Sequence, residues 1–185
     1  MSPLPNTQLV AGFLLCYNGG IMEGKKVQPR AILVFGAPCS GKSTFAEKFA
    51  KRFGIAYYNL DELKEKYALN RKLVLMLLEQ ISHTNQDLVI EGGIGTEKER
   101  EEIRRTLRPR GYNVRTVWVQ TDIATLRSRL KSRYKTIAKA KEVYNSIIPK
   151  LQAPSELESP IILSGKHTFE TQLRHILAAL ALEAK

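Results

Sequence analysis

The stretch AILVFGAPCSGKSTFAEKF, from Ala31 to Phe49, decides the fold of this chain. Its first five residues are apolar and end at Gly36, as is typical of a buried strand. After Lys42, the apolar residues Phe45 and Phe49 recur at helical spacing, which predicts a helix with one face packed inward. A strand, a glycine-containing loop and a helix therefore follow one another directly.

The loop of this stretch matches the pattern G-x-x-x-x-G-K-[S/T], with Gly36, Gly41, Lys42 and Ser43 at the fixed positions. Glycines are needed because the backbone must curl with its N–H groups around phosphate oxygens, at the positive end of the following helix. Lys42 would reach the β- and γ-phosphates, and the Ser43 hydroxyl would bind Mg²⁺. An ordinary glycine-rich turn is the alternative, but the strand and helix stand where the motif requires them. The predicted nucleotide-binding residues are Gly36, Ala37, Pro38, Cys39, Ser40, Gly41, Lys42, Ser43 and Thr44.

The length and composition indicate one globular domain. The chain has 185 residues, of which 43% are hydrophobic and 25% are charged. No apolar run approaches the ~20 residues that cross a bilayer, so we expect no membrane partner. Cys16 and Cys39 have no metal-ligand spacing, which favours a reducing, cytoplasmic location.

The formal net charge of +11 is concentrated in residues 98–150, which hold 15 Lys and Arg against 5 Asp and Glu. Up to Arg105 the charges alternate in sign and fit a solvated helix face. From Arg127 to Lys141 there is no Asp or Glu, and a phosphate-rich ligand explains the surplus better. Nucleic acid would also fit this charge, but we favour a nucleotide or an anionic small molecule because no nucleic-acid motif is present.

Residues 1–29 are the least informative part of the chain. We expect an N-terminal extension, poorly ordered or arising from a misassigned start, and a helix docked on the domain is the alternative. The folded domain is predicted to cover residues 30–185.

Two acidic residues follow predicted strands beyond the loop. Asp61 stands in the first turn of a helix capped by Asn59, where it would either complement the helix dipole or act as a general base for an incoming hydroxyl. Glu91 ends the apolar stretch DLVIE and precedes Gly92 and Gly93. It is predicted to help hold Mg²⁺, and an ordinary residue at a strand end is the alternative.

Two arginines stand on the helix that Thr121 or Asp122 is expected to cap. Arg129 and Arg133 are i,i+4 neighbours and present two guanidinium groups on one face. They are interpreted either as part of a generic basic helix or as lid residues that neutralise a transferred phosphoryl group. Arg71, in the first turn of another predicted helix, is expected to face solvent, with an anionic acceptor as the alternative.

Strands and helices alternate along the whole chain, which predicts an α/β fold: a mostly parallel sheet with helices on both faces, in three layers. The carboxyl ends of parallel strands meet at one edge, so the candidate residues are expected to converge there.

The motifs GAPCSGKST, NLDELK and VIEGG, in this order, resemble those of the P-loop kinases of the adenylate-kinase-like group. The layout is most similar to the branch of polynucleotide kinase domains and zeta-toxin-like kinases. The resemblance implies a P-loop NTPase fold with five parallel strands, ATP and Mg²⁺ as cofactors, and a lid around residues 123–140. It also implies Asp61 as the base and Arg129 and Arg133 as lid arginines. Glu91 departs from the aspartate common in that branch and is closer to the uridine-kinase-like pattern.

The sequence thus predicts an ATP-dependent kinase that transfers the γ-phosphate to a hydroxyl or phosphate acceptor, with Lys42, Asp61, Arg129 and Arg133 as catalytic residues and Ser43 and Glu91 at the metal. A small molecule or nucleotide is favoured as the acceptor. A polynucleotide 5′-hydroxyl kinase and an acceptor-free P-loop ATPase are the alternatives.

Overall fold

The computed structural model describes residues 28–182, and its centre is a five-stranded sheet. The strands stand in the order β2-β3-β1-β4-β5, and every pair is parallel. Their bounds are β1 Arg30–Phe35, β2 Ala56–Asn59, β3 Leu88–Glu91, β4 Asn113–Gln120 and β5 Ile161–Ser164. The predicted fold class and the five parallel strands are confirmed.

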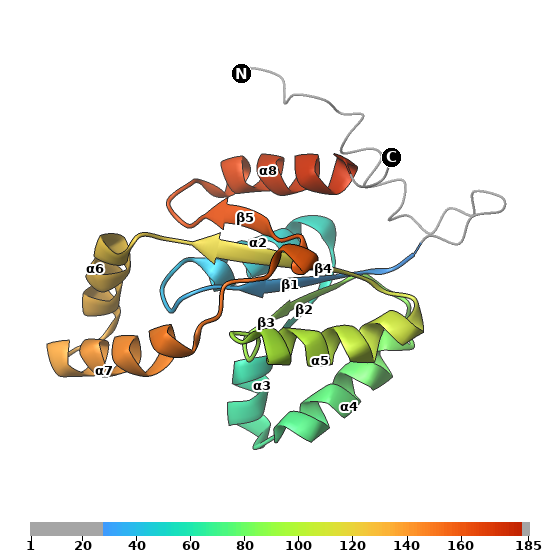
Figure 1. The fold of residues 1–185 in the computed structure, drawn as a ribbon, viewed down its shortest axis with the longest axis horizontal. Coiled ribbons are helices and arrows are strands. Elements are labelled where there is room, and N and C mark those ends of the chain that lie inside the picture. Colours follow the sequence, from blue (N-terminus) through green and yellow to red (C-terminus); the bar gives the residue numbers. More distant parts are fainter. Residues whose placement is uncertain (1–27, 183–185) are drawn as a thin grey trace.

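Helices cover both faces of this sheet (Figure 1). Helices α2 (Lys42–Phe53) and α8 (Phe169–Leu182) pack on one face. Helices α4 (Arg71–Ser82) and α5 (Glu97–Leu107) cover the other, with α3 (Leu60–Tyr67) beside them. Helices α6 (Ile123–Arg133) and α7 (Ile137–Ile147) lie at the carboxyl edge of the sheet, on the left of Figure 1. Short 3₁₀ turns, η1 Arg108–Arg110, η2 Ile148–Lys150 and η3 Glu156–Glu158, complete the described elements.

Strand β1 divides the hydrophobic core in two, because successive side chains of a strand point to opposite faces. Ile32 and Val34 pack with α2 and α8, whereas Leu33 and Phe35 pack with α4 and α5. All of these side chains are at most 2% exposed, so the strand preceding the loop is fixed on both sides.

The strand register brings the predicted site residues to one edge of the sheet. Val34 pairs with Glu91, and Glu91 pairs in turn with Asn59 on the outer strand β2. Gly36, which follows β1, and Asp61, which follows β2, therefore lie at the same carboxyl edge as Glu91.

The ends of the predicted elements also agree with their capping chemistry. The Asn59 side chain accepts from the N–H groups of Asp61 and Glu62, and Thr96 forms a capping box with Glu99. Asp122, one of two predicted caps, accepts from the N–H of Thr125. The predicted extension lies outside the described residues, apart from 28 and 29. None of the helices within residues 28–182 is long and apolar enough to cross a membrane.

Candidate active site

The loop between β1 and α2 adopts backbone angles and packing that require glycine at its fixed positions. Gly41, at the start of α2, has a φ of 101°. A Cβ on Gly36 would lie 2.4 Å from the carbonyl oxygen of Val119, so a larger residue would push β1 and β4 apart. The loop thus delivers the N-terminal amides of α2, which lack partners within the helix, to the carboxyl edge of the sheet.

Glu91 joins the end of β3 to this loop. Its Oε1 accepts a hydrogen bond of 2.7 Å from the Ser43 hydroxyl and lies 3.8 Å from the Lys42 ammonium. Glu91 is only 2% exposed, so its charge is compensated by these neighbours rather than by bulk water. The structure therefore brings the predicted residues Lys42, Ser43 and Glu91 together.

These residues fit a magnesium ion of the kind that P-loops hold. Ser43 uses its proton toward Glu91, so the lone pairs of its oxygen remain for a cation. Within residues 28–182 there is no group of three or more His, Cys, Asp or Glu that would hold a metal alone. Mg²⁺ commonly keeps several waters and takes its other ligands from substrate phosphates, which agrees with this small set of protein oxygens.

Tyr57, on β2, is a site residue that the sequence analysis missed. Its hydroxyl donates a hydrogen bond of 2.6 Å to Glu91 Oε2, the oxygen that Ser43 does not contact. Burial raises the pKa of the Tyr57 hydroxyl, and the hydrogen bond to Glu91 raises that pKa further, so the hydroxyl keeps its proton. Tyr57 and Glu91 are in contact because β2 pairs with β3, and no local sequence pattern predicts that pairing.

Asp61 lies beside the two glycines that follow β3. A Cβ on Gly92 would lie 2.9 Å from Asp61 Oδ2, and Gly93 also approaches this side chain closely. The Asp61 side chain is 66% exposed and lies 3.9 Å from the Lys64 ammonium. The carboxylate is thus at the carboxyl edge of the sheet, with its oxygens near the two glycines after β3 and much of its surface open to a ligand.

The two α6 arginines line a cavity of about 690 Å³ together with Lys42, Ser43 and Thr44. Arg129 donates from Nη1 to the carbonyl oxygens of Cys39 and Ser40, at 3.2 and 3.3 Å, and from Nη2 to that of Gly165, at 2.9 Å. Its guanidinium therefore joins the phosphate-binding loop to the loop after β5. Arg133, one turn later, is exposed.

The expectation that Arg71 faces solvent is wrong. Its guanidinium donates to the carboxylate of Glu102 and to the carbonyl oxygens of Gly93 and Glu99. Because these acceptors lie in α5 and in the segment before it, Arg71 ties α4 to the loop that passes Asp61. The acceptors of Arg71 follow it in the chain by 22 to 31 positions. The sequence therefore showed a cation at the start of a helix but not the groups that it contacts.

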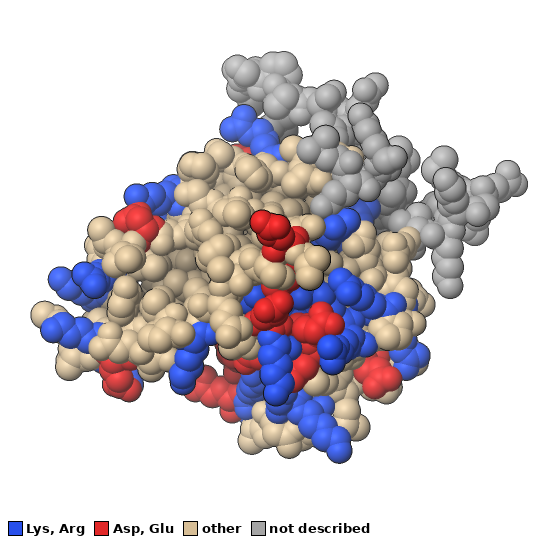
Figure 2. Space-filling model, viewed as in Figure 1, with Lys and Arg blue, Asp and Glu red and all other residues tan. Residues whose placement is uncertain are grey.

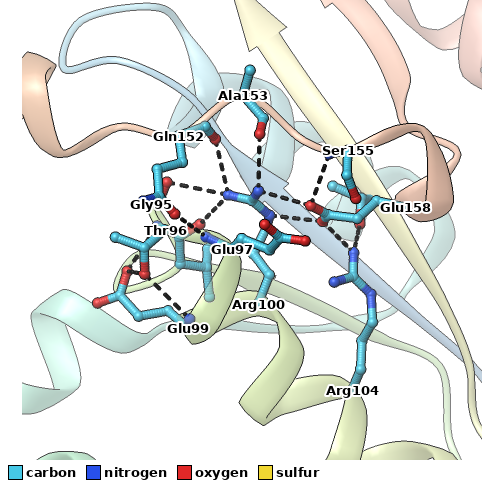
Figure 3. Close-up of polar contacts among 12 residues, drawn as sticks. Gly95, Thr96, Glu97, Glu99, Arg100, Arg104, Gln152, Ala153, Ser155 and Glu158 are labelled. Atoms are coloured by element: carbon cyan, nitrogen blue, oxygen red, sulfur yellow. Dashed lines mark hydrogen bonds and ion pairs between the residues drawn. The ribbon is translucent and has the colours of Figure 1, made fainter.

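A second cluster, centred on Arg100, holds the segment that follows α7 against α5. Arg100 of α5 is fully buried and forms two hydrogen bonds with the Glu158 carboxylate, at 2.7 and 2.8 Å (Figure 3). It also donates to the carbonyl oxygens of Gly95 and Gln152, and Arg104 binds the same Glu158 carboxylate. The loop after β3 and the segment 152–158 are thus held by one guanidinium.

The basic span from 98 to 150 is partly neutralised where it forms α5. Arg100 and Arg104 are paired with Glu158, and Arg105 is paired with Glu101. Figure 2 shows acidic and basic side chains intermixed over this part of the surface. The solvated-helix interpretation therefore holds for the exposed pair of Arg105 and Glu101 but is wrong for Arg100 and Arg104, which are buried against Glu158. Arg129 and Arg133 of α6 line the cavity beside the loop.

Comparison with known proteins supports the same architecture. The solved structures that match include a gluconokinase from Sinorhizobium meliloti 1021, with a TM-score of 0.61 and 18% identity over 86% of this chain and 95% of that chain. The APS kinase CysC of Mycobacterium tuberculosis, in complex with AMPPNP and APS, has a TM-score of 0.59 and 19% identity over 84% of this chain and 99% of that chain. Kti12 from Chaetomium thermophilum, in complex with ADP-AlF3 and not described as a kinase, has a TM-score of 0.60 and 13% identity over 81% and 96%. Among curated proteins none matches this sequence.

A family model described as AAA domain (AAA_33) matches residues 32–154, which is more than half of the chain and includes the phosphate-binding loop and Glu91. The predicted resemblance to the adenylate-kinase-like P-loop kinases is confirmed at the level of this group. The chain therefore belongs to the AAA domain family and has the P-loop kinase-like fold.

Proposed function

We propose that this protein is an ATP-dependent kinase that transfers the γ-phosphate to a small-molecule or nucleotide acceptor. The observation that carries the proposal is the joining of Lys42, Ser43 and Glu91 at the loop. The structural neighbours include a gluconokinase and an APS kinase, and the small size of gluconate and APS supports a small-molecule or nucleotide acceptor.

Each residue has a role that follows from its position. The loop amides and Lys42 bind the phosphates, and Ser43 with Glu91 holds Mg²⁺, which when bound neutralises charge on the phosphates. Asp61, open to the carboxyl edge, orients the acceptor hydroxyl and takes its proton. Arg129 orients the loop through its carbonyl oxygens, and the exposed Arg133 supplies positive charge to the nucleotide.

The decisive experiment is a screen for ATP-dependent phosphorylation of sugars and other hydroxyl compounds, nucleosides, nucleotides and 5′-hydroxyl oligonucleotides. We expect transfer to a small molecule or nucleotide. Phosphorylation of the oligonucleotides alone would instead support the polynucleotide kinase alternative. ATP hydrolysis at a rate that no acceptor changes would support the acceptor-free ATPase.

Two substitutions separate binding from chemistry. Lys42→Ala should abolish turnover because the lysine charge on the phosphates is lost. Asp61→Asn should keep ATP affinity but reduce transfer by about 10²-fold or more, since the amide cannot accept the proton. Glu62→Gln, an exposed acid in the same helix turn, is the matched control and should transfer at the wild-type rate. Normal transfer by Asp61→Asn would show that the base assignment is wrong.

A further inference from the structure

Tyr57 reaches the site from a face of β2 that packs against the α2 side of the core. Its ring lies among apolar side chains, and its hydroxyl ends 2.6 Å from Glu91 Oε2. Tyr58, the next residue, points to the opposite face and packs with the α4 and α5 side. Tyr57 thus has both an apolar and a polar contact, and the two can be separated by removing a single oxygen atom.

The two oxygens of Glu91 have different partners. Oε1 is shared by the Ser43 hydroxyl and, at 3.8 Å, the Lys42 ammonium, whereas Oε2 has the Tyr57 hydroxyl. A buried carboxylate oxygen without a donor is costly, so the carboxylate would turn toward the nearest alternative donor. The nearby ammonium of Lys42 is such a donor, and a shorter ion pair there would compete with phosphate for the lysine.

We infer that Tyr57 is a positioning residue for Glu91, which keeps the carboxylate turned toward Ser43. With Oε2 satisfied by Tyr57, the Ser43 hydroxyl continues to donate its hydrogen bond to Oε1, and its lone pairs stay toward the nucleotide side. This role rests on the proposed function, because it assumes that the loop binds Mg²⁺ with a nucleotide. It concerns binding and not transfer, so it can be tested without knowing the acceptor.

The test compares Tyr57→Phe with Tyr58→Phe, which removes the same atom on the opposite face of the same strand. Calorimetric titration of each protein with ADP, with and without Mg²⁺, measures how much the metal strengthens nucleotide binding. Tyr57→Phe should reduce that gain by about 10-fold while leaving the affinity for metal-free ADP unchanged. Tyr58→Phe should match the wild type in both titrations.

A double variant distinguishes positioning from simple packing. In a Glu91→Gln background, Tyr57→Phe should cause no further loss of the Mg²⁺-dependent gain, because the group that it orients has been changed. Equal losses with and without Mg²⁺, or a full loss in the Glu91→Gln background, would overturn the role of Tyr57 while leaving the kinase proposal intact. A wild-type protein that binds no ADP would instead overturn the proposed function itself.

Discussion

Glu91 and Glu158 are two nearly buried carboxylates whose surroundings differ. Their side chains are 3% and 5% exposed, and Glu91 faces α2 whereas Glu158 faces α5. Glu158 is bound by two guanidinium groups, from Arg100 and Arg104 (Figure 3). Glu91 is bound by two hydroxyls and has one ammonium at 3.8 Å.

The difference indicates what each carboxylate does. Arg100 is fully buried and belongs to the packed interior, so the charge of Glu158 is neutralised permanently by the fold. The cation nearest Glu91, Lys42, lies in the phosphate-binding loop and faces the cavity beside it. A ligand can therefore change the surroundings of Glu91, whereas the surroundings of Glu158 are fixed.

The largest effect on folding is expected from Glu158→Gln. The variant leaves the buried Arg100 and Arg104 without a compensating charge, which should lower the free energy of unfolding by about 3–5 kcal/mol. Urea denaturation followed by circular dichroism measures this change. Glu101→Gln, which breaks only the exposed pair with Arg105, is the control and should cost about 0.2–1 kcal/mol. Equal, small losses in both variants would show that the Arg100 cluster contributes no more than a surface pair.

The fold was largely predictable because its signals are local. The apolar run before Gly36, the capping box of Thr96 and Glu99, and the cap at Asn59 each lie within a few residues. Arg100 and Glu158 are 58 positions apart, and their pairing follows from how the segment after α7 crosses α5. The sequence showed two charges in separate segments and could not show that they meet.

The next largest effect is the loss of folding stability at low pH. Burial alone would raise the pKa of Glu158, but the hydrogen bonds and charges of Arg100 and Arg104 outweigh it and lower the pKa from 4.5 to about 2. The resulting stabilisation is present above pH ~4.5 and is lost as the pH falls toward ~2, by about 3 kcal/mol in total. Unfolding free energies of the wild type and Glu158→Gln, measured across this range, should converge at low pH. A constant difference between them would contradict the lowered pKa.

In the candidate site, as in the fold, residues in local motifs could be predicted and long-range contacts could not. Lys42 and Ser43 were identified from a motif, and Glu91 from its place at the end of a strand. Tyr57 could not be predicted as a site residue because its contact with Glu91 spans 34 positions and depends on the pairing of β2 with β3. Arg71 was placed in solvent because the sequence does not show that its three acceptors lie in and beside α5.

Glu91→Gln is expected to affect folding much less than Glu158→Gln, even though its effect on activity should be large. The amide oxygen can still accept from one of the Ser43 and Tyr57 hydroxyls, and the amide NH2 can donate to the oxygen of the other. Since the ammonium of Lys42 has access to the cavity, the loss should be about 1 kcal/mol. Turnover should fall by at least 10-fold, because the carboxylate charge beside Ser43 is lost. Denaturation and ATP consumption, measured on the same preparation, test both parts. If Glu91→Gln destabilised the fold as much as Glu158→Gln, the contrast between the two carboxylates would fail and Glu91 would be structural.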